Sequence, residues 1–279
     1  MGSKPSGRPT PTKLETVVVP VVPNIPPGII GEILDHLARS DSKHLRLCSL
    51  VSKLWVPLCR QRLFYTIAFT SKDVEKWLKT FPVPEKGPAR YVRDLRFSLK
   101  AYYGAPEAFF EHILWFKKVE RVTLQGSGQF QPLWTPPFVR LPQSTTSLTV
   151  NTDNIPLAKI RNVMVQLPNL NDLWLSGSPV EVGKNTPPGM GKALRGRFGG
   201  QLRLLKGHAD MNFMNMLLEV PTGLHFTELQ IRGPRECLVS IVRLAEACSR
   251  TLVKLLYTIS SYTIFSYGKF HPFSRSSLF

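Results

Sequence analysis

The first patterned segment of the chain is predicted to form a short amphipathic helix. Aliphatic side chains recur there at intervals of three and four, which places them on one helical stripe: Ile29, Ile30, Ile33, Leu34 and Leu37. Pro26 and Pro27 precede this stripe. Proline suits a first helical turn because the amide hydrogen that it lacks would have no partner there. We therefore expect a helix that begins at these prolines and ends near Ala38.

Two further helices are predicted before residue 70. Ser40 and Asp41 belong to the residue types that cap helix N-termini well. The apolar face of the second helix is expected to carry Leu45, Leu47, Cys48, Val51, Leu54 and Trp55, and that of the third Leu58, Cys59, Leu63 and Phe64. Three helices in about 45 residues make a marginal core by themselves. The module 24–69 should therefore pack against the following domain or against a partner.

A short apolar pattern recurs between residues 88 and 257 and predicts a repeat architecture. In each copy two residues separate the first apolar position from the second, and one residue separates the second from the third, as in Leu170, Leu173 and Leu175. The central positions are residues 95, 122, 148, 173, 205, 229 and 255, so the intervals are 27, 26, 25, 32, 24 and 26 residues. Because apolar alternation is typical of strands, each copy predicts a short β-strand.

Helical patterns lie between these predicted strands. Their apolar positions are Phe109, Phe110, Ile113 and Leu114; Leu157, Ile160, Met164 and Leu167; Phe213, Met214 and Leu217; and Leu238, Ile241, Val242, Ala245 and Cys248. Strands and helices that alternate at this period predict parallel strands lining one face and helices covering the other. The expected fold combines a three-helix module with an irregular α/β solenoid over residues 70–257, and an ordinary α/β domain is the alternative.

Three segments depart from the repeat pattern. Residues 1–23 are expected to form a disordered, basic, proline-rich tail, and residues 258–279 to leave the last repeat uncapped and poorly ordered. The longest interval contains an insertion, residues 183–207, which is expected to form a flexible loop. This loop is either simply solvated or contacts an acidic partner through its bases, Lys184, Lys192, Arg195, Arg197, Arg203 and Lys206.

The composition is strongly basic. The chain of 279 residues has 36 Lys and Arg against 19 Asp and Glu, a net charge of +17, so nucleic acid, anionic membranes and acidic proteins are candidate partners. Its four cysteines form no Cys-x-x-Cys pair and sit among apolar residues, which favours free thiols in a reducing compartment, the cytoplasm or the nucleus. No apolar run approaches the length of a membrane-spanning helix. The first six residues match the N-myristoylation pattern at Gly2, or are simply a basic tail.

No pattern for catalysis, a cofactor or a metal emerges, so we do not expect an enzyme. The run Gly189-Met190-Gly191-Lys192 resembles a phosphate-binding loop superficially, but Thr186 stands where that motif needs its first glycine. Ala193 replaces the Ser or Thr that follows the lysine. The six histidines are scattered, without the spacing of metal ligands.

The helical module resembles an F-box. Ile25-Pro26, the pair Ile33-Leu34 and the block Leu50-Val51-Ser52-Lys53-Leu54-Trp55 follow one another in the order and spacing of that family. The resemblance covers about 40 residues, roughly a seventh of the chain. One departure is Gly28, which stands where the family usually has an acidic residue. Glycine lowers helix propensity there and removes a favourable contact with the helix dipole, so docking through this module is expected to be weaker.

This resemblance implies a binding partner, the Skp-type adaptor of a cullin-based ubiquitin ligase. The residues that it implies for adaptor contact are Ile25, Pro26, Ile29, Ile30, Leu34, Leu50 and Val51, whereas Trp55 is expected to pack inside the module. An ordinary three-helix core built from the same residues is the alternative interpretation.

The repeat region is similar to leucine-rich repeats, which often follow an F-box. The Asn or Cys that usually follows each strand is replaced here by Ser127, Asp153, Ser178 and Pro234, so we expect an irregular solenoid without the usual side-chain ladder. Together the two resemblances imply a substrate-recognition subunit that binds an unknown target protein on its repeat surface. The alternative is a basic scaffold that binds nucleic acid or another polyanion, and a third option is a peripheral membrane protein anchored through Gly2.

Overall fold

A computed structural model describes residues 25–98, 107–126, 142–152, 155–177, 179–180, 190–194, 198–205, 211–259 and 264–267. Its first part is a bundle of three mutually packed helices, α1 (Pro27–Ser40), α2 (Ser42–Val51) and α3 (Trp55–Leu63). As predicted, prolines lead into α1, and Asp41 caps α2 by accepting a hydrogen bond from the Lys43 amide at 2.8 Å. The second helix is shorter than predicted, because it ends at Val51 and Trp55 begins the third.

The second part is one large sheet. Eight parallel strands stand side by side in their order along the chain, and each lies next to its predecessor in this sheet. They are β1 (Thr66–Phe69), β2 (Asp94–Ser98), β3 (Arg121–Gly126), β4 (Ser147–Thr152), β6 (Asp172–Ser176), β8 (Gln201–Leu205), β9 (Glu228–Gly233) and β10 (Lys254–Ile259). Outside this sheet, β5 (Ile155–Pro156) pairs with β7 (Pro179–Val180).

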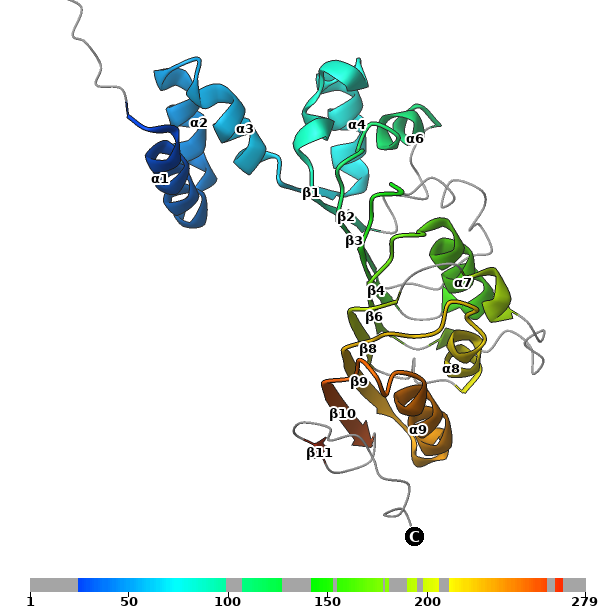
Figure 1. Cartoon of the computed structure of the whole chain (residues 1–279). Helices are drawn as coiled ribbons and strands as arrows, with labels where there is room; N and C mark the ends of the chain where they lie inside the picture. The colour runs from blue at the N-terminus through cyan, green and yellow to red at the C-terminus, as the bar shows by residue number, and fades with distance from the viewer. Residues whose placement is uncertain are drawn as a thin grey trace, which may run out of the picture.

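The described helices of the repeat part all cover one face of the sheet, and none of them covers the other, which we call the open face (Figure 1). They are α4 (Ser71–Thr80), α6 (Glu107–Ile113), α7 (Leu157–Gln166), α8 (Met211–Leu218) and α9 (Leu238–Ala247). Short 3₁₀ turns join them: η1 (Pro84–Lys86), η2 (Pro88–Tyr91), η4 (Met190–Ala193) and η5 (Arg235–Cys237). Parallel strands in sequential order with helices on one side form the predicted α/β solenoid-like arrangement, and the four predicted helices are α6 to α9.

The core lies between the sheet and these helices. Along each strand alternate side chains point to opposite faces, so Leu173 and Leu175 of β6 are buried under the helices while Trp174 between them is exposed. The first repeats have an aromatic core in which the ring of Phe69 lies 4.9–6.3 Å from the rings of Trp77, Phe97, Phe109 and Phe116. This alternation gives the sheet an apolar face under the helices and a more polar face on the opposite side.

Successive repeats are joined by a ladder of backbone hydrogen bonds just before the strands. The carbonyl oxygen of Tyr65, for example, accepts from the amides of Arg93 and Asp94 at 2.9 and 3.0 Å. The carbonyls that accept two consecutive amides of the next repeat in this way belong to Tyr65, Arg93, Glu120, Thr146, Gly200 and Thr227. This backbone ladder connects neighbouring repeats at the start of their strands.

The boundary between the two parts differs from the prediction. β1 belongs to the sheet, so the helical module ends at Leu63 and not at residue 69. A repeat signal was present but overlooked, because Phe64, Ile67 and Phe69 follow the same apolar spacing as the other copies. The helix α4 was not predicted either, although Thr70 and Asp73 mark its start: the Thr70 amide donates to the Asp73 carboxylate at 2.9 Å.

The basic insertion was expected to form a flexible loop apart from a strand copy centred on Leu205, and the structure places that strand in another register. Residues 201–205 form β8, in which Leu202 pairs with Leu173 and both are buried, whereas Leu205 lies on the other side of the strand. The predicted central position, Leu205, is therefore wrong by three residues, and the longest interval is shorter than predicted. Leu202, Leu204 and Leu205 allow two registers in sequence, and only the pairing partners decide between them.

The end of the array also departs from the prediction. A strand from the C-terminal region, β11 (Ile264–Tyr267), pairs antiparallel with β10, where an uncapped and poorly ordered end was expected. An antiparallel neighbour ends the parallel series and covers the backbone edge of β10. The rest of residues 260–279 lies outside the described part, as do the tail 1–23 and Gly2.

Candidate partner-binding surfaces

The helical bundle exposes two stripes of apolar side chains. On α1 and just before it, Ile25, Ile29 and Ile33 are exposed at a spacing of four, which is one face of a helix. On α2 and the turn after it, the exposed residues follow the spacing three, one and three: Leu47, Leu50, Val51 and Leu54. Leu50 and Val51 are 82% and 71% exposed. Large apolar side chains gathered in this way are typical of an interaction surface.

Five of the seven predicted adaptor contacts are accessible. Ile25, Pro26, Ile29, Leu50 and Val51 are exposed. The other two, Ile30 and Leu34, are buried with Leu45 and Cys59 in the core of the bundle, so the prediction that they face a partner is wrong. The physical reason is that α1 carries aliphatic residues around almost half of its circumference, and the stripe of Ile30, Leu34 and Leu37 faces the other two helices. Trp55 packs partly buried against this core, as predicted.

The bundle is held by a polar clamp as well as by this small core. The guanidinium of Arg62 on α3 donates to the Asp35 carboxylate at 2.7 Å and to the Gly31 carbonyl at 3.0 Å, both on α1. It also donates to the Leu58 carbonyl at 3.2 Å. The hydrogen bond from Arg62 holds the pKa of the Asp35 carboxyl below its usual range. Arg62 therefore sets the angle between the helix that carries one apolar stripe and the rest of the bundle.

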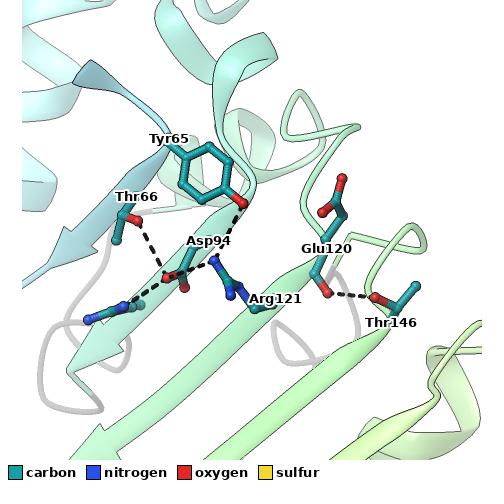
Figure 2. A network of polar contacts seen from close by, with 7 residues as sticks. Tyr65, Thr66, Asp94, Glu120, Arg121 and Thr146 are labelled. Carbon is teal, nitrogen blue, oxygen red and sulfur yellow. Dashed lines mark hydrogen bonds and ion pairs between the residues drawn. The ribbon is translucent and has the colours of Figure 1, made fainter. Parts of the chain in front are cut away.

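A second polar network lies where the first strands of the sheet begin, beside the connection from α3 (Figure 2). At its centre is Asp94, whose side chain is only 5% exposed. Its carboxylate accepts from Arg96 at 2.8 Å and from the Thr66 hydroxyl at 3.4 Å, and lies 3.9 Å from the Arg121 guanidinium. Arg121 in turn donates to the Tyr65 hydroxyl at 3.5 Å.

Tyr65 lies in the connection from α3 to β1, and this connection is fixed from both sides. Its carbonyl carries the first step of the backbone ladder, and its hydroxyl reaches the Asp94 network. Next to it, the ring of Phe64 meets the edge of the Phe81 ring at 6.3 Å. The exposed stripes of the bundle are thus tied to the repeat sheet through backbone, polar and aromatic contacts.

The bases predicted for an acidic partner do not form one loop. Lys192 is exposed on η4, and Arg203 lies in β8, on the open face of the sheet. Lys184, Arg195, Arg197 and Lys206 lie outside the described residues. The structure adds a residue that the sequence analysis missed, Trp174, which is the register partner of Arg203 and lies with it on the open face. The alternation of Trp174 with Leu173 and Leu175 was the available signal.

The run around Gly191 has a structural role. Its amide donates to the Glu219 carboxylate at 2.9 Å, so the donor that a phosphate would need is already used. A Cβ at this position would lie 1.9 Å from the Met216 carbonyl oxygen, which explains why η4 needs glycine to approach α8. This geometry agrees with the sequence argument against a phosphate loop.

Other chemical features of the described residues are few. The four cysteines are free, as expected, and burial raises the pKa of the Cys248 thiol to about 11. Within the described residues, His, Cys, Asp and Glu side chains form no cluster of three that could hold a metal ion. Nor do these residues include a helix with the length and apolarity that crossing a membrane requires. When the chain is compared with models of known protein families and with curated proteins, none matches.

Proposed function

We propose that this chain is the substrate-recognition subunit of a Skp–cullin–F-box ubiquitin ligase. Its α1–α2 surface binds the Skp-type adaptor, and its repeat sheet binds the protein to be ubiquitinated. The observation that carries the proposal is the pair of exposed apolar stripes on α1 and α2, in a bundle whose sequence resembles an F-box. An ordinary three-helix core made from these residues would have buried them.

The energetics favour a covered surface. Burying a Val, Leu or Ile side chain fully is worth about 1.5–3 kcal/mol. Leu50, Leu54 and Val51 are the most exposed of these side chains, so they have the most surface to bury against an adaptor. The bundle has a small core of its own, so a partner that covers these side chains also stabilises it.

The chain would act through proximity. A ligase of this kind holds a lysine of the target near a ubiquitin thioester carried by another protein, which turns a bimolecular encounter into a reaction within one complex. The recognition subunit supplies no reacting group in this scheme. Its contribution is a defined spacing between adaptor and target, which the contacts around Tyr65 and Asp94 support.

Co-elution of the full chain with purified Skp-type adaptor on size-exclusion chromatography tests the proposal. The double variant Leu50→Asp, Val51→Asp should lose co-elution while keeping its circular dichroism spectrum. The matched control is the double variant Val239→Asp, Val253→Asp. It changes two apolar residues of the last repeat that are also largely exposed, and it should leave co-elution intact. Adaptor binding that survives the first pair, or is lost with the second, contradicts the proposed surface.

The net charge of +17 favours one alternative, a scaffold that binds nucleic acid. Binding through phosphates releases counterions, so the affinity for a single-stranded oligonucleotide would fall steeply with salt. A steep fall of the oligonucleotide affinity with salt, together with a lack of adaptor binding, would favour this alternative over the ligase function.

A further inference from the structure

In the middle of the open face of the sheet, an exposed aromatic residue lies among basic and neutral neighbours. Trp174 on β6 is 39% exposed, and it is the register partner of Arg203 on β8. Arg203 is the register partner of Gln230 on β9, two residues before Arg232. Because neighbouring strands lie about 4.8 Å apart and a strand rises about 3.3 Å per residue, Trp174, Arg203 and Arg232 fall within a patch about 12 Å across. The helices leave this face uncovered (Figure 1).

Arg203 is held in place without being neutralised. Its guanidinium carbon lies 5.1 Å from the centre of the Trp174 ring, and it donates to the Gln201 side-chain carbonyl at 2.7 Å. Both partners are uncharged. Within the described part of the chain, no carboxylate lies within ion-pair distance of Arg203 or Arg232. An arginine that is oriented on an aromatic ring and has no counter-ion is well prepared to bind an anionic group.

The acids of the open face are confined to the first residue of their strands and already have partners. Asp94 pairs with Arg96, Glu228 lies 3.8 Å from Lys254, and Asp172 accepts from the Gln201 amide at 2.7 Å. The third and fifth residues of the parallel strands also lie on the open face, and none of them is Asp or Glu. The charged side chains beside Trp174 at these positions are therefore basic, and the carboxylates lie at the edge where the strands start.

We propose that Trp174, Arg203 and Arg232 bind an acidic segment of a partner protein, with an apolar side chain on the indole and carboxylates on the two guanidinium groups. This inference deepens the proposed function and rests on it only for the role of that partner as the ubiquitination target. A protein segment fits better than nucleic acid for two reasons. Strands of nucleic acid stack successive bases on several aromatic rings, and a continuous line of phosphates would meet Asp172 and Glu228.

Fluorescence anisotropy of the full chain with a labelled peptide tests the inference. The probe alternates Glu and Gly around one central Leu, and a second probe has Gln in place of every Glu. The Glu probe should bind, and the Gln probe should bind at least tenfold more weakly. Arg203→Gln and Arg232→Gln should each weaken binding about three- to tenfold, as expected for charge-assisted hydrogen bonds at a partly exposed site. Trp174→Leu should weaken it and Trp174→Phe restore most of it.

The matched control is Arg243→Gln, which should leave the affinity unchanged. Arg243 is an exposed residue of α9, the helix that covers the opposite face of the sheet. These side chains lie outside the core, and an unchanged melting temperature confirms folding. Equal loss in the control would mean diffuse charge attraction and overturn the inference, as would equal binding of both probes. Tighter binding of oligothymidylate that depends on Trp174 would overturn it in favour of nucleic acid. Adaptor co-elution, measured separately on these variants, reports on the ligase function alone.

Discussion

Arg62 and Asp35 form the closest tie between the first and third helices of the bundle, with the guanidinium nitrogen 2.7 Å from the carboxylate oxygen. Arg62 is largely buried and also donates to two backbone carbonyls, so its guanidinium has three acceptors inside the bundle. A bundle that keeps several large aliphatic residues on its surface depends on such a clamp to hold its helices in one arrangement.

Replacing Arg62 with Lys should loosen the bundle even though the charge is kept. A lysine ammonium cannot reach all three groups that accept hydrogen bonds from the planar guanidinium. We therefore expect the stability of the bundle to fall by about 2–3 kcal/mol. Hydrogen exchange at the amides of α1 measures this loss locally. Arg60→Lys, an exposed neighbour on the same helix, is the control and should exchange like the unaltered protein. Equal exchange in both variants would show that the clamp is dispensable.

Gly28→Glu should stabilise α1 and strengthen adaptor binding. A Cβ at position 28 meets no atom within 4 Å, and the first turn of α1 holds no acidic residue. Removing glycine from a helix and placing a negative charge at its N-terminus together contribute about 1–2 kcal/mol. Urea denaturation followed at α1 measures the stability, and a titration with the adaptor measures the affinity. Gly28→Gln separates the two effects, since it should show the helix gain without the charge; a drop in stability for both variants would contradict the argument.

Gly200→Ala should destabilise the repeat with the longest interval. A Cβ at Gly200 would lie 1.9 Å from the Asp172 carboxylate, which accepts the Gln201 amide at 2.7 Å. The clash would push the carboxylate away and leave this amide without its partner, at a cost of about 2 kcal/mol or more. Thermal unfolding measures the change. The same substitution at the open position Gly28 should be neutral or stabilising, so an equal melting temperature for the two variants would refute this explanation.

The stability of the chain should fall as the pH drops below about 6.5, in part through His112. This residue is buried on α6, its Nδ1 has no hydrogen-bond partner among the described residues, and burial lowers its pKa. The unfolded chain therefore binds a proton that the folded chain resists, and the free energy of unfolding decreases between the unfolded pKa and the lowered, folded one. His112→Gln should flatten this decrease in urea titrations between pH 8 and pH 5.5. An unchanged slope would exclude His112 as a source.

The sequence patterns predicted the repeat elements well, because burial imposes a strict alternation on a strand. Leu173 and Leu175 are inward for the same reason that Trp174 is outward, and the rule holds for every strand around it. β8 alternates as well, but its register was predicted wrongly because Leu204 and Leu205 are adjacent, which makes the alternation ambiguous in sequence. Only the strand partners and the close approach of Gly200 to Asp172 select the register there.

The candidate site was less predictable, for a physical reason that α1 makes clear. Ile29, Ile30, Ile33 and Leu34 cover a wide arc of the helix, and hydrophobicity alone does not say which half of that arc faces its own bundle. The packing of α2 and α3, with Arg62 above Gly31, decides that Ile30 and Leu34 are inside and Ile29 and Ile33 outside. A partner surface of this kind can be identified only after the structure shows which of the apolar residues are buried in the core.

Hydrogen exchange of the full chain with and without purified Skp-type adaptor tests the central claim most directly, since it reports on each helix separately. The ligase account predicts slower exchange in α1 and α2 on adding the adaptor, and no change in the strands from β4 to β10. Unchanged exchange in both helices at saturating adaptor, or protection confined to the sheet, would contradict it.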